Sequence, residues 1–310
     1  MYGQAVMLTA AGTVVTLICL LGVVWLGPAA ALLNVMTAVP AVYLSIRLGL
    51  RHGLILVGAT SVLLLLLTSP YTLATYLALF GTGSLLLSLL LLVRTPWDRA
   101  AFYTVVGALL FSVLLMMLVT ITGSATPTEL VERIVQAEAE QAMQIYRQSG
   151  FSDQQLQEVG QVINRLATFV TTGFLGILVM VLLSIQAVTL LVLRTLTRKH
   201  FSIAGVAFAD WRLPARLIWL LIFSGFTAFS GLPVLAWLGQ NLLLVLLPLY
   251  FLQGMAVVSS FLQRRPWPVA IKGMIYLALL VLSPLPLVVT SIGIFDLWID
   301  FRKNRQEKLT

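Results

Sequence analysis

The sequence predicts an all-α polytopic membrane protein, a transmembrane helical bundle of about 8–10 membrane segments. Of its 310 residues, 60% are hydrophobic and only 10% are charged, whereas a soluble domain carries about 25% charged residues. The apolar residues form continuous runs such as "SVLLLLLTSPYTLATYLALFGTGSLLLSLLLLV". A β-barrel would alternate apolar and polar residues instead. Helices are therefore expected, because the backbone of a helix satisfies its own hydrogen bonds in lipid.

Apolar segments near the length of a membrane span, roughly 20 residues, recur along the chain. They lie at about 5–26, 29–46, 53–68, 71–93, 101–123, 166–193, 214–236 and 241–262, followed by a stretch from about 268 to 300. Pro284 and Pro286 interrupt that last stretch, because proline removes a helical hydrogen bond and clashes with the preceding turn. We expect a hairpin there, giving ten segments. One kinked helix is the alternative.

Charge in the connections predicts the orientation. Alternate connections are basic and rich in arginine: they hold Arg47 and Arg51, Arg94 and Arg99, the residues from Arg194 through Arg216, and Arg264, Arg265 and Lys272. The others, "WLGPAA", "TSPYT" and "WLGQN", carry no charge. The positive-inside rule places the arginines in the cytoplasm. The N-terminus and the basic tail "RKNRQEKLT" are expected on the same side. We therefore expect a multi-pass protein of the bacterial inner membrane, and its arginines would attract anionic lipid headgroups.

One region differs from the rest, so we divide the chain into 1–124, 125–165 and 166–310. The middle part holds six of the eleven acids and reads as a helical hairpin at about 126–165 on the outer face. Thr126-Pro127 is a helix start, Gly150 is a helix end, and Ser152 with Gln155 is a capping box. The hairpin is a solvated connector, a lid over an outward-facing site, or an arm that docks a protein partner.

Enzyme chemistry finds little support, and we expect no catalytic residues, no metal and no cofactor. Cys19 is the only cysteine, and the two histidines, His52 and His200, are far apart in sequence. Hydrolase, phosphate-loop and metalloprotease motifs do not occur. The net charge of +8 is concentrated in short membrane connections, so nucleic acid is not an expected partner.

Polar side chains inside the apolar segments are the candidate ligand-binding residues. Asn34, Gln186 and Gln253 are uncharged, whereas ion-coupled transporters usually carry an ionisable residue at membrane depth. We expect a transport component that binds a small neutral or zwitterionic ligand through these three residues. Such amides also join helices by hydrogen bonds. The alternative function is therefore a membrane scaffold or regulatory subunit that recruits partners at the hairpin, at the cytoplasmic face or through lipids.

The stretch "SIGIFDLWIDFRK" ends the last apolar segment with two aspartates. Asp296 and Asp300 share one helix face, and the repulsion between them calls for a cation from Arg264, Arg265, Lys272 or the dipeptide Arg302-Lys303. We expect an anchor that fixes the last helix. The pattern resembles the C-terminal end of the YybS-like family of predicted bacterial membrane proteins, through Gly293, Phe295, Asp296, Trp298, Asp300 and Arg302.

The order of the parts is also similar to that family, with a helical insert near the middle that carries a turn from Tyr146 to Gly150. The family is distantly similar to the S components of energy-coupling-factor transporters. That similarity implies a helical bundle that binds a vitamin or a metal and docks on a separate ATPase module. The present chain has more segments and a longer insert.

Overall fold

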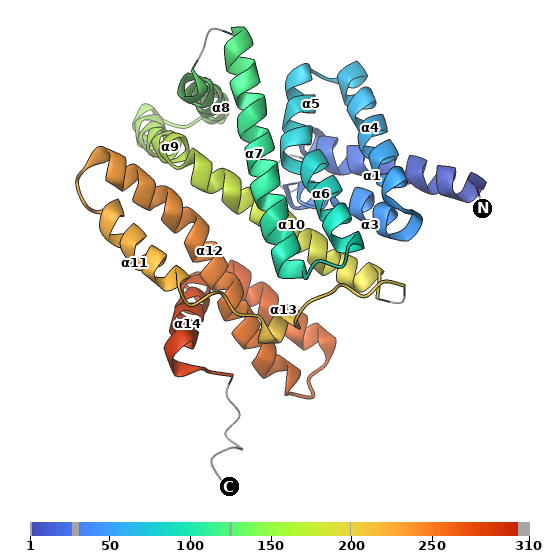
Figure 1. Cartoon of the computed structure of the whole chain (residues 1–310). Coiled ribbons are helices and arrows are strands. Elements are labelled where there is room, and N and C mark those ends of the chain that lie inside the picture. Colours follow the sequence, from blue (N-terminus) through green and yellow to red (C-terminus); the bar gives the residue numbers. More distant parts are fainter. Residues whose placement is uncertain (1, 27–30, 124–125, 199, 303–310) are drawn as a thin grey trace. The chain divides into compact units, whose positions relative to one another are not determined.

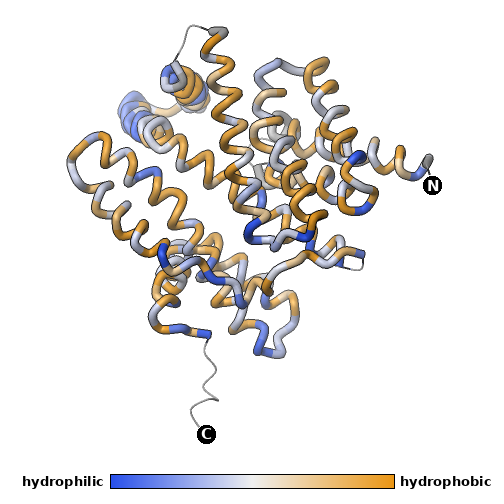
Figure 2. Tube along the Cα trace, in the orientation of Figure 1, coloured by the Kyte–Doolittle hydropathy of each residue, from blue (hydrophilic) through white to orange (hydrophobic). Residues whose placement is uncertain are grey.

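The protein is described by a computed structural model, which covers residues 2–26, 31–123, 126–198 and 200–302. Every regular element in these ranges is a helix, and none is a strand. Hydrophobic residues dominate most helices, as the orange tube in Figure 2 shows. The basic tail after Arg302 lies outside the described residues.

The helices in chain order confirm the predicted all-α class (Figure 1). They are α1 Tyr2–Leu26, α2 Ala31–Asn34, α3 Val39–Leu48, α4 Leu50–Leu67, α5 Pro70–Tyr76, the π-helix η2 Leu77–Gly81, α6 Thr82–Leu92, α7 Trp97–Gly123, α8 Pro127–Gln148, α9 Asp153–Thr172, α10 Phe174–Leu196, the 3₁₀-helix η3 Phe208–Asp210, α11 Leu217–Ala228, α12 Pro233–Gln263, α13 Val269–Val281 and α14 Leu285–Ile299.

Six of these stretches are long and apolar enough to cross a membrane: Gly3–Gly22, α4, Pro70–Leu92, Trp97–Ile121, α10 and α12. Two more apolar helices, α3 and α11, are shorter. The break predicted at "SPLP" is present, and α13 and α14 meet there at 97°. The two helices are thus nearly perpendicular rather than antiparallel, which fits a broken span or a re-entrant loop. Together with α3, α11 and the α13–α14 pair, the six long apolar helices are consistent with a polytopic helical bundle.

One predicted connection is wrong. "WLGQN" was expected to be a turn, but Trp237–Asn241 lies inside α12. The turn falls earlier, where Gly231 adopts a φ of +72° and Pro233 opens α12. Gly239 serves close packing: an added Cβ would collide with the backbone of α11 at Ala228 and Ser224. Glycine thus signals a helix contact here rather than a helix end.

The chain divides into two compact units. Unit 1 comprises Met1–Gln141 and Val181–Gly205, and unit 2 comprises Ala142–Met180 and Val206–Thr310. In unit 1, buried Leu56, Leu64, Tyr76 and Phe80 form the main hydrophobic core together with Ile185 of α10. In unit 2, α12 packs closely against both α11 and α14.

A π-helical turn interrupts the helix that runs through α5 and α6. Within it, the carbonyl of Ala78 accepts a hydrogen bond of 3.3 Å from the Ser112 hydroxyl of α7, which also donates to the Ala108 carbonyl of its own helix at 2.7 Å. Such turns are rare and often lie at functional sites. This one brings α7 into hydrogen-bonding contact with the middle of the α5–α6 helix.

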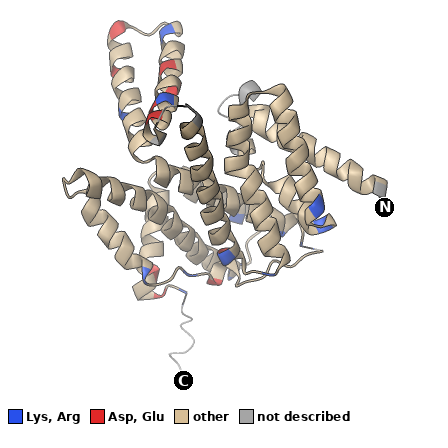
Figure 3. Cartoon of the chain, turned by 45° about the horizontal axis from the view of Figure 1, so that its top comes forward, with Lys and Arg blue, Asp and Glu red and all other residues tan. Residues whose placement is uncertain are grey.

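The segment from 126 to 172 forms the two helices that the sequence indicated. Thr126 caps α8 by accepting from the Glu129 N–H, and Gly150 has a φ of +78° between the helices. Ser152 and Gln155 complete the predicted capping box at the start of α9. Figure 3 shows acidic and basic residues along α8 and α9, which is typical of helices outside the lipid. The second helix extends to Thr172, beyond the predicted end at 165.

Candidate functional site

A buried ion pair holds the end of α14 in unit 2. The Asp296 carboxylate lies 2.7 Å from the Arg302 guanidinium, and their side chains are 0% and 5% exposed. Arg302 is one of the cations expected here, but it pairs with Asp296 alone, and Asp300 pairs with Arg212, which was not among the expected cations. Arg302 also donates to the carbonyls of Ala209 and Trp211, at 2.9 and 2.7 Å. One arginine therefore fixes both the last helix and the connection around η3.

Gln253 of α12 belongs to the same network. Its amide nitrogen donates to Asp296 at 3.4 Å, and its amide oxygen accepts from the Leu213 N–H at 3.0 Å. Arg264, at the end of α12, donates to the carbonyl of Arg302 at 2.9 Å. Both ends of the Gln253 amide are therefore occupied by groups of the protein itself.

Asp300, the second predicted aspartate, has a different environment. It ends α14 in a left-handed conformation, with a φ of 46°. Its carboxylate pairs with Arg212 at 2.5 Å, and the two side chains remain 49% (Arg212) and 34% (Asp300) exposed. Phe295 and Trp298 are exposed on the same helix, as expected for an aromatic belt. The two aspartates thus hold the same connection from two sides.

Two glycines make this arrangement possible. A Cβ at Gly293 of α14 would collide with the Tyr250 carbonyl, and a Cβ at Gly254 of α12 would collide with the Val289 carbonyl. The backbones of the two helices therefore touch, as small residues permit in membrane helices. Gly293 was singled out in the sequence, whereas Gly254 was not.

The third helix contact of unit 2 uses Asn241, which the sequence did not single out as a site residue. Its side chain accepts from the Gly176 N–H at 2.8 Å and donates to the carbonyls of Thr172 and Trp237, each at 2.9 Å. These bonds tie α12 to the junction of α9 and α10. An asparagine within an apolar run was the available signal, but sequence does not reveal its partners.

Gln186 has a contrasting environment within unit 1. It lies on α10, is 1% exposed, and neither atom of its side-chain amide has a hydrogen-bond partner in the described residues. The hydroxyls of Thr104 on α7 and Thr189 on α10 are likewise buried and without partners there. A Cβ at Gly83 of α6 would lie 2.9 Å from the Gln186 nitrogen and 3.8 Å from Thr104. Two helices, α7 and α10, thus bring uncharged polar side chains close to Gly83 of α6.

Asn34 lies at the end of α2, also in unit 1, where its amide oxygen accepts from Thr37 at 3.4 Å. The three predicted ligand-binding residues therefore differ in kind. Gln253 is fully engaged, Asn34 has a local partner, and only Gln186 is both buried and unengaged.

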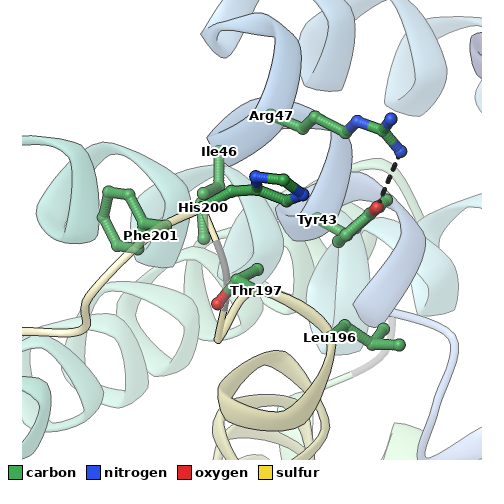
Figure 4. Close-up of a pocket in the computed structure, with 7 residues that line it drawn as sticks. All are labelled: Tyr43, Ile46, Arg47, Leu196, Thr197, His200 and Phe201. Atoms are coloured by element: carbon green, nitrogen blue, oxygen red, sulfur yellow. Dashed lines mark hydrogen bonds between the residues drawn. The ribbon is translucent and has the colours of Figure 1, made fainter.

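A pocket of about 270 Å³ opens at the arginine-rich end of unit 1 (Figure 4). Its walls are the last turns of α3 and α10 and the segment that follows α10, and its lining residues are Tyr43, Ile46, Arg47, Leu196, Thr197, His200 and Phe201. Three connections meet at this end, because Arg94 also donates to the carbonyl of Ser202 at 2.8 Å. No group of three metal-ligating side chains occurs anywhere in the described ranges.

Comparison with known proteins agrees with this architecture. No functionally described protein and no solved structure matches the chain. A family model described as "Predicted membrane protein (DUF2232)" matches residues 13–297. The match includes Asp296 and ends before Asp300 and Arg302. The match covers most of the chain, and the chain has the apolar helices of a membrane protein. The chain is therefore a member of the DUF2232 family of predicted membrane proteins.

Proposed function

We propose that this protein is a transport component that binds a small neutral or zwitterionic ligand in unit 1. The single observation that carries the proposal is the Gln186 amide, which is 1% exposed and has no hydrogen-bond partner in the described residues. A buried polar group without a partner costs about 1–3 kcal/mol. Such groups are uncommon in folded proteins and call for an explanation, and a bound molecule supplies one.

The chemistry around Gln186 defines the class of ligand. The amide offers two donor hydrogens and an acceptor oxygen, and the hydroxyls of Thr104 and Thr189 each donate and accept. These groups carry no net charge, so they suit a molecule whose own charges are absent or internally balanced. Gly83 of α6 lets the amide approach closely, since an added Cβ would lie 2.9 Å from its nitrogen.

The orientation follows from the charged end of unit 1. Arg47, Arg94 and the segment after α10 come together there, and the positive-inside rule assigns such an end to the cytoplasm. The protein is then a bacterial inner-membrane protein whose N-terminus is cytoplasmic. The resemblance of the chain's C-terminal end to the YybS-like family, and through it to transporter S components, supports the same function. We propose binding and passage rather than catalysis.

Native mass spectrometry of the protein purified in a mild detergent tests this function. The wild type is expected to retain a small molecule that the Gln186→Leu variant loses. Gln240→Leu is the matched control, because Gln240 lies on an exposed face of α12. Retention of the same molecule by Gln186→Leu, or an empty wild type in every preparation, would refute the proposal.

A second candidate function rests on α9. None of its residues is buried, and Val162, Leu166 and Phe169 are 50–58% exposed. An amphipathic helix with an uncovered apolar side suits a scaffold that recruits a protein partner. Deletion of residues 128–170, which removes these three side chains, would then remove co-purifying proteins while leaving Gln186-dependent ligand retention intact. Partners that stay bound after the deletion would eliminate the scaffold role of this hairpin.

A further inference from the structure

The pocket at the arginine-rich end of unit 1 has one dominant feature, an arginine without an acidic partner. The ion pairs of the described residues are Arg302–Asp296 and Arg212–Asp300, and both belong to unit 2. Arg47 instead donates one N–H to the Tyr43 hydroxyl, at 2.9 Å, as the dashed line in Figure 4 marks. A guanidinium carries five N–H donors, so four remain for a ligand or for water.

The tyrosine also holds the guanidinium in place. The Arg47 Cζ lies 5.9 Å from the centre of the Tyr43 ring, a distance at which a cation and an aromatic face attract each other. An oriented arginine loses less side-chain freedom when it binds an anion, so it binds more tightly. Planar guanidinium groups are also the preferred partners of phosphoryl oxygens.

The wall opposite Arg47 is positioned by a second arginine. Arg94 donates to the Ser202 carbonyl at 2.8 Å, and its Cζ lies 4.7 Å from the ring centre of Phe201. It thereby fixes the segment that carries His200, whose imidazole lines the pocket. No aspartate or glutamate is among the lining residues. The polar part of the pocket is therefore suited to an anion.

The location and the remaining lining point to a lipid. The candidate span of α10 ends at Leu196, and Leu196 lines the pocket and is 52% exposed. The pocket thus begins where the apolar span ends, at the depth of the lipid headgroups. Ile46, Leu196 and Phe201 give it an apolar side that a free inorganic ion would not use. Its volume of about 270 Å³ falls just below the roughly 300–1,000 Å³ of small-molecule sites, which suits a headgroup.

We propose that this pocket binds the phosphoryl headgroup of an anionic phospholipid, with Arg47 and His200 facing the phosphate and Leu196 facing the start of an acyl chain. General attraction between membrane arginines and anionic lipids is diffuse. The site proposed here is specific, because it requires Arg47 and not the neighbouring Arg51, which does not line the pocket. It is independent of the ligand proposed for Gln186.

Lipid-dependent thermal stability of the full chain in detergent tests the proposal. Phosphatidylglycerol is expected to raise the melting temperature, whereas phosphatidylcholine and inorganic phosphate are not. Arg47→Gln is expected to raise the half-maximal phosphatidylglycerol concentration about tenfold or more, because a hydrogen bond to a charged group contributes about 1.5–3 kcal/mol. Tyr43→Phe is expected to give a smaller increase, and Arg51→Gln none.

Each other outcome overturns the proposal. An equal response to inorganic phosphate would make the pocket a free-anion site, and an equal response to phosphatidylcholine would remove the selectivity for anionic lipids. An equal loss in Arg51→Gln would show that the attraction is diffuse. If Arg47→Gln does not fold, His200→Gln takes its place, and an undiminished response in that variant contradicts the site.

Discussion

Gln186 in unit 1 and Asp296 in unit 2 are both 1% exposed, yet one carboxylate oxygen of Asp296 has partners, whereas neither atom of the Gln186 amide does within the described residues. Asp296 contacts Arg302 and Gln253, which continue the network to Trp211 and Leu213. Gln186 has no hydrogen-bond partner in the described residues and borders Gly83 and the unpartnered Thr104. Burial alone is thus a poor guide to function in a membrane helix. The partners decide whether a polar group holds the fold or remains free for a ligand.

The largest expected effect is the loss of the buried ion pair. Asp296→Asn removes the charge that compensates Arg302, and breaking such a pair costs about 3–5 kcal/mol. We expect a correspondingly lower free energy of unfolding in mixed micelles, with membrane insertion retained. The matched double variant Asp296→Leu/Arg302→Leu is expected to recover much of the loss, because no buried charge remains unpaired. An unchanged stability of Asp296→Asn would show that the network does not anchor α14.

The second-largest loss of stability is expected where a methyl group is added to a glycine that lies in a helix contact. Gly293→Ala is expected to destabilise the protein by about 1–3 kcal/mol, because the added methyl meets the Tyr250 carbonyl. Gly83→Ala meets only the end of the Gln186 side chain, so it is expected to affect ligand retention more than stability. Gly273→Ala, on open α13, is the control and is expected to leave the melting temperature unchanged or raised. Equal losses in all three variants would show that the collision at Gly293 is not the cause of the destabilisation.

Replacing the two glutamines by leucine compares the units directly. Gln253→Leu leaves the Leu213 N–H without a partner and removes one of the two partners of Asp296, and we expect a loss of about 1–3 kcal/mol. In ligand-free protein, Gln186→Leu is expected to be neutral or stabilising, because it removes an amide that has no partner. Chemical unfolding of both variants under the same conditions measures the difference. A strong destabilisation by Gln186→Leu would place Gln186 with Gln253 as a residue that holds helices together.

The smallest effect is expected at the surface ion pair. Asp300→Asn breaks the ion pair with Arg212. The side chains of these two residues are one third to one half exposed, and exposed ion pairs contribute about 0–1 kcal/mol to stability. The shift in melting temperature should therefore be far below that of Asp296→Asn and should shrink at high salt. If the two variants are equally unstable, the distinction between the aspartates is wrong.

Local signals of the hairpin and of the last stretch were readable from the sequence. Ser152 with Gln155, Thr126 with Pro127, and the prolines of "SPLP" act within a turn or two of themselves, so their effects appeared where predicted. Residues of the same types gave a wrong prediction where they act through contacts between helices that are distant in sequence. Gly239 resembled a turn residue but permits contact between α11 and α12, and a helix contact leaves no short-range pattern.

Composition and the continuous apolar runs by themselves determined that this chain is a helical membrane protein with several apolar helices. Those properties follow from the lipid, which acts on every residue of a span regardless of its neighbours. Only the tertiary structure decided what each polar residue does. Asn34, Gln186 and Gln253 are equivalent in sequence, and the difference between them lies in which donors and acceptors the folded helices bring within about 3 Å. The two aspartates of "FDLWID" also differ in environment because of their partners. Asp296 faces Arg302 inside the protein, and Asp300 faces Arg212 at its surface.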